Sequence, residues 1–306
     1  MLLLCLPALA ALALAAPAAA RAPIVGIGDQ NTPMFSDPAF RALGVKHSRL
    51  ALPWNWNKDP YTLGQTDAWM AAAKAARVRP FVAFNRDWSD NGHRKLPSMR
   101  AYRRSFRAFR ARYPHVREFS AWNEANHSTQ PTYRKPRAAA RFYNAMRSSC
   151  PRCTIVAADV LDSRNMVPWL NKFRRYARKP KIWGLHNYQD ANNGTSDGTR
   201  ELLKAVRGKI WLTETGGIRR LKPQPGSKGR GRRATLAGQA TAVGRVYRLA
   251  RLSSRISRIY FYEWKAQPRN RWDSAFVNAD GTLRPAYYAL KRGLRNGAVR
   301  ESRRDR

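Results

Sequence analysis

Acidic residues are scarce in this chain. Only 19 Asp and Glu residues stand against 58 Lys and Arg, which gives a formal net charge of +39 over 306 residues. Such a charge attracts polyanions, and the candidate partners are nucleic acid, anionic wall polymers and acidic polysaccharides. The alternative explanation is compositional, a solvated basic surface, because the Arg residues are spread along predicted helices rather than gathered in one block. Charge alone leaves both explanations open.

Cysteine is nearly absent as well. The chain has three, and Cys5 falls in an apolar N-terminal stretch, which leaves Cys150 and Cys153 for the mature protein. Two cysteines alone cannot build a four-ligand zinc site, and the five His residues show no ligand spacing. A redox motif would need a strand before it and a helix after it, whereas here the predicted order is reversed. We therefore predict no metal or cofactor, and a structural disulfide between Cys150 and Cys153.

Long hydrophobic runs are missing except at the N-terminus. Leu2 to Ala20 is almost purely Leu and Ala, and small residues precede Arg21. This pattern predicts a secretory signal peptide over residues 1–22, although the basic segment that usually opens one is missing, as in a truncated signal. The alternative is an uncleaved membrane anchor. We expect a secreted protein with no membrane span in the mature chain.

The rest of the chain alternates between predicted strands and helices. The 43% hydrophobic content is enough for a sizeable core. Eight strands joined by helical crossovers predict a single (β/α)8 barrel over residues 23–297, an α/β fold, followed by a basic tail over 298–306. The predicted strands cover residues 23–28, 45–52, 79–84, 116–122, 154–158, 181–185, 209–214 and 256–262. The predicted helices cover residues 66–77, 98–113, 133–149, 165–177, 199–206, 234–252 and 285–294, with a shorter one before residue 42.

Two of these strands end in a glutamate. The fourth ends in Trp122-Asn123-Glu124 and the seventh in Glu214, which two glycines follow. Active sites of such barrels lie at the carboxyl ends of the strands. Two carboxylates there suit glycosidic bond cleavage, in which one protonates the leaving oxygen and the other attacks or activates water. A lone glutamate at a strand end is more often a solvated end or half of a salt bridge, and the matched pair makes that explanation weaker here.

Other polar and aromatic residues are expected at the same end of the barrel. Trp faces stack on sugars, while Asn and His bind hydroxyl groups. Trp54 could therefore bind substrate, or pack at the rim. Asp159 could bind substrate, but we expect it to cap the segment that follows.

The arrangement resembles clan A of the glycoside hydrolases, which are retaining (β/α)8 enzymes, and most of all its xylosidase-like and cellulase-like branches. In that clan an Asn-Glu pair ends the fourth strand and a Glu ends the seventh, as in Asn123-Glu124 and Glu214. Many members read Asn-Glu-Pro, where this chain has Ala125. Further residues match places that the clan often fills with Arg, His, Tyr and Trp: Arg49, His186, Tyr188 and Trp264.

The resemblance implies a two-step retaining mechanism. Glu214 would attack the anomeric carbon, and Glu124 would act as acid and then as base. We expect the charge of Glu214 to raise the pKa of Glu124. Asn123 and His186 would bind the sugar. The resemblance further implies that Arg49 and Tyr188 hold Glu214 in place and that Trp264 forms the floor of the sugar subsite.

Two other functions compete with a secreted glycosidase. The first is an inactive barrel that binds cell-wall polysaccharide. The presence of both glutamates is evidence against it. The second is a nucleic-acid-binding protein, but no specific nucleic-acid-binding motif is found. The partner we expect is a carbohydrate substrate. An acidic glycan is one candidate, because a basic loop over residues 218–232 follows Glu214.

Overall fold

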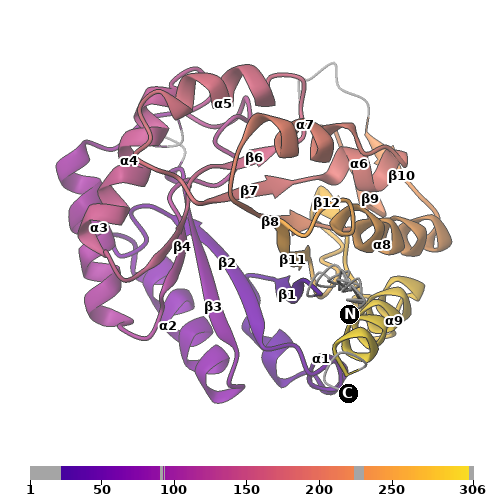
Figure 1. Cartoon of the computed structure of the whole chain (residues 1–306). Helices are drawn as coiled ribbons and strands as arrows, with labels where there is room; N and C mark the ends of the chain where they lie inside the picture. The colour runs from indigo at the N-terminus through magenta and orange to yellow at the C-terminus, as the bar shows by residue number, and fades with distance from the viewer. Residues whose placement is uncertain (1–21, 90–91, 93, 224–230, 303–306) are drawn as a thin grey trace, which may run out of the picture.

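The computed structural model describes residues 22–89, 92, 94–223 and 231–302. The predicted signal segment, the tip of the basic loop (224–230) and the last residues of the tail (303–306) lie outside the described residues. The chain forms a parallel barrel with helices around it (Figure 1). The predicted (β/α)8 fold is confirmed.

The barrel is built from nine parallel strands. Their bounds are β1 Ile24–Gly28, β2 His47–Pro53, β3 Arg79–Asn85, β4 Glu118–Ser120, β5 Thr154–Val156, β6 Asp159–Leu161, β7 Ile182–His186, β8 Lys209–Thr215 and β11 Ile256–Tyr262. The sheet order is β5-β4-β3-β2-β1-β11-β8-β7-β6. Because only residues 157–158 separate β5 from β6 along the chain, the two ends of this order are joined and the barrel closes.

Alternate strand residues fill the barrel interior. The side chains of Phe81, Val156, Trp211 and Tyr260 form a separate buried cluster from four different strands. Glu118 and Arg258 pair at the beginning of their strands, with a 2.6 Å contact from Nη2 of the arginine. The guanidinium of Arg258 also lies 4.0 Å from the ring of Trp211. The interior is therefore packed with side chains, and the end at which the strands finish is where such barrels bind their ligands.

Helices cover the outside of the barrel. Their bounds are α1 Pro38–Arg41, α2 Pro60–Ala75, α3 Met99–Arg112, α4 Pro136–Ser149, α5 Met166–Arg174, α6 Tyr188–Asn193, α7 Asp197–Ala205, α8 Leu236–Ala250 and α9 Pro285–Ser302, with a 3-10 turn, η1, at Thr32–Ser36. The helix predicted from residue 66 begins earlier, at Pro60. There the Asp59 side chain accepts the Thr62 N–H at 2.8 Å and proline occupies the first turn. The last helix extends beyond its predicted end at Leu294.

A second, small sheet lies beyond the barrel. Its strands are β9 Arg220–Leu221, β10 Arg232–Arg233 and β12 Trp272–Asp273, in the order β10-β9-β12 and all antiparallel. The stems of the predicted basic loop are thus paired as β9 and β10, and β12 comes from the segment after β11. This sheet brings the loops after the seventh and eighth barrel strands together.

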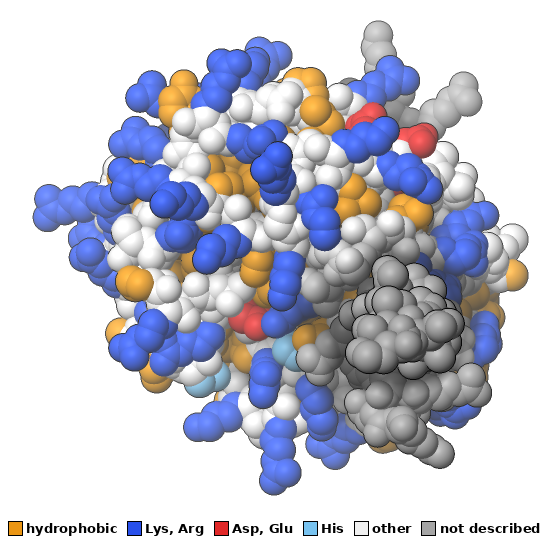
Figure 2. All heavy atoms as spheres, viewed as in Figure 1, with side chains coloured by type: hydrophobic (Ala, Val, Ile, Leu, Met, Phe, Trp, Pro, Cys, Tyr) orange, Lys and Arg blue, Asp and Glu red, His pale blue; other side chains and the backbone are white. Residues whose placement is uncertain are grey.

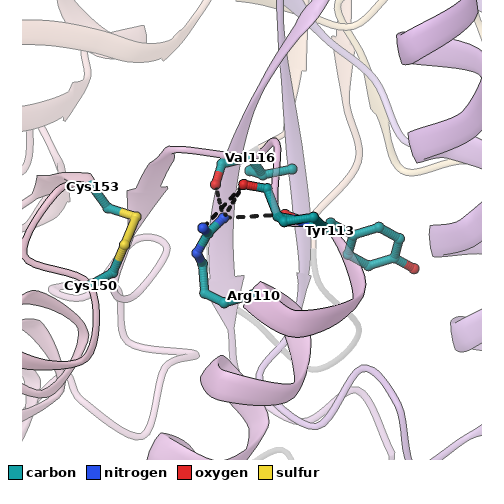
Figure 3. The surroundings of a disulfide bond; sticks show 6 residues. Arg110, Tyr113, Val116, Cys150 and Cys153 are labelled. Carbon is teal, nitrogen blue, oxygen red and sulfur yellow. Dashed lines mark hydrogen bonds between the residues drawn. A yellow bond between two sulfur atoms is a disulfide. The ribbon is translucent and has the colours of Figure 1, made fainter.

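The predicted disulfide between Cys150 and Cys153 is present, in the turn between α4 and β5 (Figure 3). Figure 3 also shows Arg110 donating to the carbonyl groups of Tyr113 and Val116, in the turn that leads from α3 into β4. Within the part of the chain that the structure describes, no helix has the length and apolar character needed to span a membrane.

Candidate active site

The carboxylates of Glu124 and Glu214 meet at the open end of the barrel. Glu124 follows β4, and Glu214 is the last residue but one of β8. Together with His186, each offers one atom within 4.8 Å of the others. The Glu124 side chain is 24% exposed and that of Glu214 is 14% exposed. A molecule that enters the mouth of the barrel can therefore touch both carboxylates.

The backbone holds Glu124 in a conformation that its side chain disfavours. Its φ is +47°, in the left-handed region that costs free energy for a residue other than glycine. Hydrogen bonds fix the chain on both sides, since the Asn123 N–H donates to the Phe84 carbonyl at 2.7 Å and the Ala125 N–H donates to the Asp159 carbonyl at 2.9 Å. The neighbouring strands thus impose the position of Glu124, a pattern that is common at active sites.

Arg49 in β2 connects the side chains of three other strands or their ends. Its Nη1 lies 2.6 Å from Oε2 of Glu214, and its Nη2 lies 3.2 Å from Oδ2 of Asp159. The same Nη2 donates to Oδ1 of Asn123, which leaves the amide N–H groups of Asn123 to donate to a ligand. Only 3% of Arg49 is exposed. A buried guanidinium in this place neutralises the charge of Glu214 and fixes its orientation.

Tyr188 holds the other oxygen of Glu214. Its hydroxyl donates to Oε1 of Glu214 at 3.1 Å, opposite the arginine contact. Burial and the nearby charge of Glu214 raise the pKa of Tyr188 well above its ordinary value, so the phenol keeps its proton. Its ring packs edge-on against Trp272 of β12, with 4.7 Å between the centroids. The small sheet thus supports the residue that orients Glu214.

His186 lies between carboxylates on both sides. Its Nδ1 is 3.3 Å from Oε1 of Glu124, and its Nε2 is 3.2 Å from Oδ1 of Asp159. Burial lowers the pKa of His186, but the charges of Asp159 and Glu214 and the hydrogen bonds to Asp159 and Glu124 outweigh it and raise the pKa to about 10. The imidazole is therefore a cation at neutral pH, and both of its nitrogens act as donors.

The predicted direction of the shift in the Glu124 pKa is wrong. We expected the charge of Glu214 to raise it. Burial does raise it, but the hydrogen bond from His186 and the charges of His186, His127 and Arg49 outweigh burial, and the pKa of Glu124 lies below its ordinary value. The charge of Glu214 is already met by Arg49, so the cations dominate at Glu124.

The expectation that Asp159 caps a following segment is also wrong. Asp159 opens β6 and is fully buried. Its carboxylate accepts hydrogen bonds from Arg49 and the Thr213 hydroxyl and contacts the His186 ring. Burial raises its pKa, but the charges of His186 and Arg49 hold it well below the usual range. The predicted strand ended at residue 158, just before β6, because the short apolar run of β5 gave no sign that the strand continues.

The two tryptophans expected at the substrate are placed differently. Trp264 is 1% exposed, its indole N–H donates to Oδ2 of Asp37 at 2.9 Å, and its ring packs against Phe40 and Phe276. It therefore belongs to the core behind the barrel, and the prediction that it floors the sugar subsite is corrected.

Trp54 is 8% exposed. It lines a hollow together with residues of α3 and has the ammonium of Lys58 5.4 Å above its ring. This placement is close to the rim packing that was the alternative for Trp54.

Two aromatic residues near the acid pair were missed. Tyr262 ends β11, and the residue before it, Phe261, pairs with Thr215 next to Glu214. Burial together with the charges of Glu263 and Glu214 raises the pKa of Tyr262 well above the ordinary value. Strand alternation could have identified it, since Tyr260 two residues earlier faces the barrel interior. Trp272 had no comparable signal, because its place depends on the small sheet.

Glu124, His186 and Glu214 are spaced closely enough to hold a metal ion. A metal ligand must offer an unprotonated ring nitrogen, whereas both nitrogens of His186 donate to carboxylates. Arg49 also places a fixed positive charge 2.6 Å from Glu214. The chemistry of this set of side chains fits a sugar hydroxyl and an anomeric carbon better than a cation.

Comparisons with known proteins agree with this geometry. Residues 88–289, more than half of the chain, match the family described as glycosyl hydrolase catalytic core. No curated protein matches the sequence.

Among solved structures, the fold resembles a family 39 glycoside hydrolase from Bacteroides cellulosilyticus WH2, with a TM-score of 0.59 and 16% identity over 90% of this chain and 64% of that one. It also resembles a family 39 β-xylosidase from Caulobacter crescentus, with a TM-score of 0.63 and 16% identity over 90% of this chain and 72% of that one. A third similar structure is xylanase 10B from Thermotoga petrophila RKU-1, with a TM-score of 0.62 and 13% identity over 90% of this chain and 94% of that one.

The chain thus spans just under two thirds of the first of these proteins, and the identities establish likeness of fold. The matched family segment contains Glu124 and Glu214, and the glycosidase barrels cover nearly all of the described chain. The protein belongs to the glycosyl hydrolase catalytic core family.

Proposed function

We propose that the protein is a retaining glycosidase that cleaves O-glycosidic bonds by double displacement. The observation that carries this proposal is the separation of the two carboxylates, whose oxygens approach within 4.8 Å. Retaining enzymes hold their two carboxyl groups about 5–5.5 Å apart, whereas inverting enzymes leave about 6.5–9.5 Å for a water molecule. A direct attack by one carboxylate therefore fits the space better than attack by an intervening water.

The surroundings of the two glutamates support a different role for each. Arg49 and Tyr188 contact Glu214 from two sides, and such contacts fix the orientation that a nucleophile needs. In the first step it would attack the anomeric carbon while Glu124 gives its proton to the leaving oxygen. In the second step Glu124 would take a proton from water, and that water would release the sugar from Glu214.

The remaining side chains suit binding of the sugar ring. Asn123 can donate from its amide to a hydroxyl group, because Arg49 occupies its carbonyl oxygen. Tyr262 ends β11 next to β8, where its ring could contact a bound sugar. Two of the similar structures are a β-xylosidase and a xylanase, so xylose-containing glycans are the first substrates to try.

Mechanism-based labelling tests this proposal. The protein would be incubated with a panel of 2-deoxy-2-fluoro glycosides, which trap the nucleophile of a retaining enzyme, and then analysed by intact mass and peptide mapping. We expect an adduct on the peptide that contains Glu214. The Glu214→Gln variant is the control and should show none. An adduct on another carboxylate, or hydrolysis with inverted product, would contradict the assignment.

An inactive barrel that binds polysaccharide is the competing function. It predicts glycan binding without turnover in wild-type protein and no adduct with any sugar of the panel. The complete charge network around Glu214 favours the enzyme, since a binding barrel has no use for a buried arginine that neutralises a nucleophile.

We further propose that the protein is exported. The apolar segment before residue 22 and the disulfide between Cys150 and Cys153 support this, because disulfides persist in oxidising compartments. The N-terminal sequence of the protein recovered from outside the cells is the test. A start near Ala22 is expected, and retention of the protein inside the cells would refute export.

A further inference from the structure

The exposed side of α3 carries a stripe of arginines. Arg100, Arg103, Arg104 and Arg107 follow the i, i+3, i+4, i+7 pattern of one helix face and line a shallow hollow of about 490 Å³. All four are exposed, and none has an ion pair to a residue that the structure describes. The opposite face of the helix is buried through aromatic residues such as Phe106.

A second basic hollow lies on the neighbouring helices. It measures about 630 Å³ between α4 and α5 and is lined by six exposed cationic residues, Arg134, Lys135, Arg137, Arg141, Lys172 and Arg175. Tyr176 also lines it, with the Arg137 guanidinium 5.1 Å above its ring. Helices α3, α4 and α5 follow one another around the barrel (Figure 1). We call the ten cationic residues of the two hollows the basic belt.

Acidic side chains do not balance this surface. Between Ser98 and Tyr176 the acidic residues are Glu118, Glu124, Asp159 and Asp162, and each is either buried or faces the barrel interior or the acid pair. In Figure 2 the margin of the molecule over α3, α4 and α5 shows many Lys and Arg side chains and no Asp or Glu among the described residues. Like charges three and four residues apart on a helix repel each other. A ligand with several negative charges would relieve that repulsion.

The belt begins at the same loops as the candidate active site. Arg134 and Lys135 stand in the segment between Glu124 and α4. Arg104 lines a further hollow of about 290 Å³ with Trp54 and Lys58, which follow β2. Because helices of such a barrel start on the side of the active site, the stripe on α3 leads toward the barrel mouth.

We propose that the basic belt binds an acidic polysaccharide and holds it beside the catalytic mouth. Guanidinium groups form paired hydrogen bonds with carboxylate or sulfate oxygens, and an exposed array of them suits a flexible chain with repeated negative charges. Single-stranded nucleic acid fits less well, since it needs aromatic faces for its bases and the face of Tyr176 is covered by Arg137. That the polymer is a glycan rests on the proposed function, whereas the binding surface itself does not.

Binding of fluorescein-labelled oligogalacturonate, followed by fluorescence anisotropy over a salt series, tests the proposal. The test variant carries Arg100→Gln, Arg103→Gln, Arg104→Gln and Arg107→Gln, because Gln keeps helix propensity. The matched control loses the same number of charges from exposed positions on other helices or their ends, through Lys204→Gln, Arg207→Gln, Arg248→Gln and Arg292→Gln. A third variant, with Arg137, Arg141, Lys172 and Arg175 changed to Gln, tests the second hollow independently.

We expect the control variant to bind like the wild-type protein and both belt variants to bind more weakly. Each released counterion contact contributes roughly 0.7–0.9 to the slope of log affinity against log salt, so four lost contacts should reduce the slope by about three. Equal binding by the α3 variant, the α4–α5 variant and the control would overturn the proposal. Belt-dependent binding of a labelled oligothymidylate but not of oligogalacturonate would overturn it in favour of nucleic acid.

The Glu214→Gln variant separates this proposal from the proposed function. It should bind oligogalacturonate as tightly as the wild-type protein, because Glu214 lies outside the belt. If no 2-fluoro glycoside labels the protein while belt-dependent binding persists, the proposed function is refuted and the proposal of polysaccharide binding is kept. If labelling occurs and the belt substitutions do not change binding, only the proposal of polysaccharide binding is refuted.

Discussion

His186 Nδ1 lies 3.3 Å from Oε1 of Glu124, and the imidazole has no exposed surface. The candidate acid therefore faces a cation, with Asp159 behind the ring and Arg49 beside it. This contact explains why the pKa of Glu124 is lowered, and it has consequences for the pH dependence of the proposed reaction.

The pH–rate profile should respond to His186. A general acid acts in its protonated form, so a lowered pKa of Glu124 places the alkaline limb of kcat/KM at acidic pH. His186→Gln removes the positive charge that lowers this pKa, and the alkaline limb should move to higher pH by about one unit or more. His115→Gln, at a position remote from the pair, is the control. A profile whose alkaline limb stays in place would show that His186 does not set the pKa of Glu124.

The same residue should couple folding to pH. The pKa of His186 is raised to about 10 in the folded state, from about 6.5 in an unfolded chain. The folded state therefore binds more protons between these values, and the free energy of unfolding should be highest below pH 6.5 and fall as pH rises toward 10. The loss should be on the order of a few kcal/mol. Denaturant unfolding at several pH values measures it, and His186→Gln should flatten the curve in this range.

Arg49→Met should damage both stability and activity. It leaves the carboxylates of Asp159 and Glu214 without their guanidinium partner, and breaking a buried ion pair in this way costs about 3–5 kcal/mol. Thermal unfolding and 2-fluoro glycoside labelling would be measured together. Arg104→Met, an exposed arginine on α3, is the control and should be nearly neutral in stability. A stable, fully labelled Arg49→Met protein would remove Arg49 from the proposed mechanism.

Tyr188→Phe isolates one hydrogen bond. The change keeps the ring contact with Trp272 and removes the donor to Oε1 of Glu214. A hydrogen bond to a charged group contributes about 1.5–3 kcal/mol, so the rate of labelling should fall roughly tenfold to a hundredfold. Tyr176→Phe, on the outer surface, should label at the wild-type rate. Equal rates for the two variants would contradict the role of Tyr188.

Substitution of Trp264 should mainly reduce stability, whereas substitution of Trp272 should mainly reduce activity. Trp264→Ala removes a fully buried ring and should cost about 3–5 kcal/mol of unfolding free energy. Trp272→Ala removes the ring that supports Tyr188 from the small sheet, and it should reduce labelling with a smaller loss of stability. Denaturant unfolding and labelling rates check both. The reverse pattern would restore Trp264 to the substrate site.

The barrel and its two glutamates could be predicted from local features of the chain. Strand and helix periodicity, glycine after Glu214 and the Asn123-Glu124 pair are all read over short windows, and a closed parallel barrel brings the ends of its strands together. Chain order alone therefore identified which carboxylates could meet. The resemblance to clan A glycoside hydrolases, rather than chain order, identified Arg49 and Tyr188, which the structure places against Glu214.

Tertiary structure decided the burial of each residue and the charges that surround it. The pKa of Glu124 depends on which charges are nearest, and a cation from β7 outweighs the carboxylate that the sequence suggested. Trp264 is buried and Trp272 lies near the site because packing behind the barrel and pairing of β12 with β9 involve residues far apart in the chain. The basic belt likewise becomes a surface only when α3, α4 and α5 lie side by side. Sequence patterns encode local conformation, whereas burial and electrostatics are sums over neighbours that only the folded chain assembles.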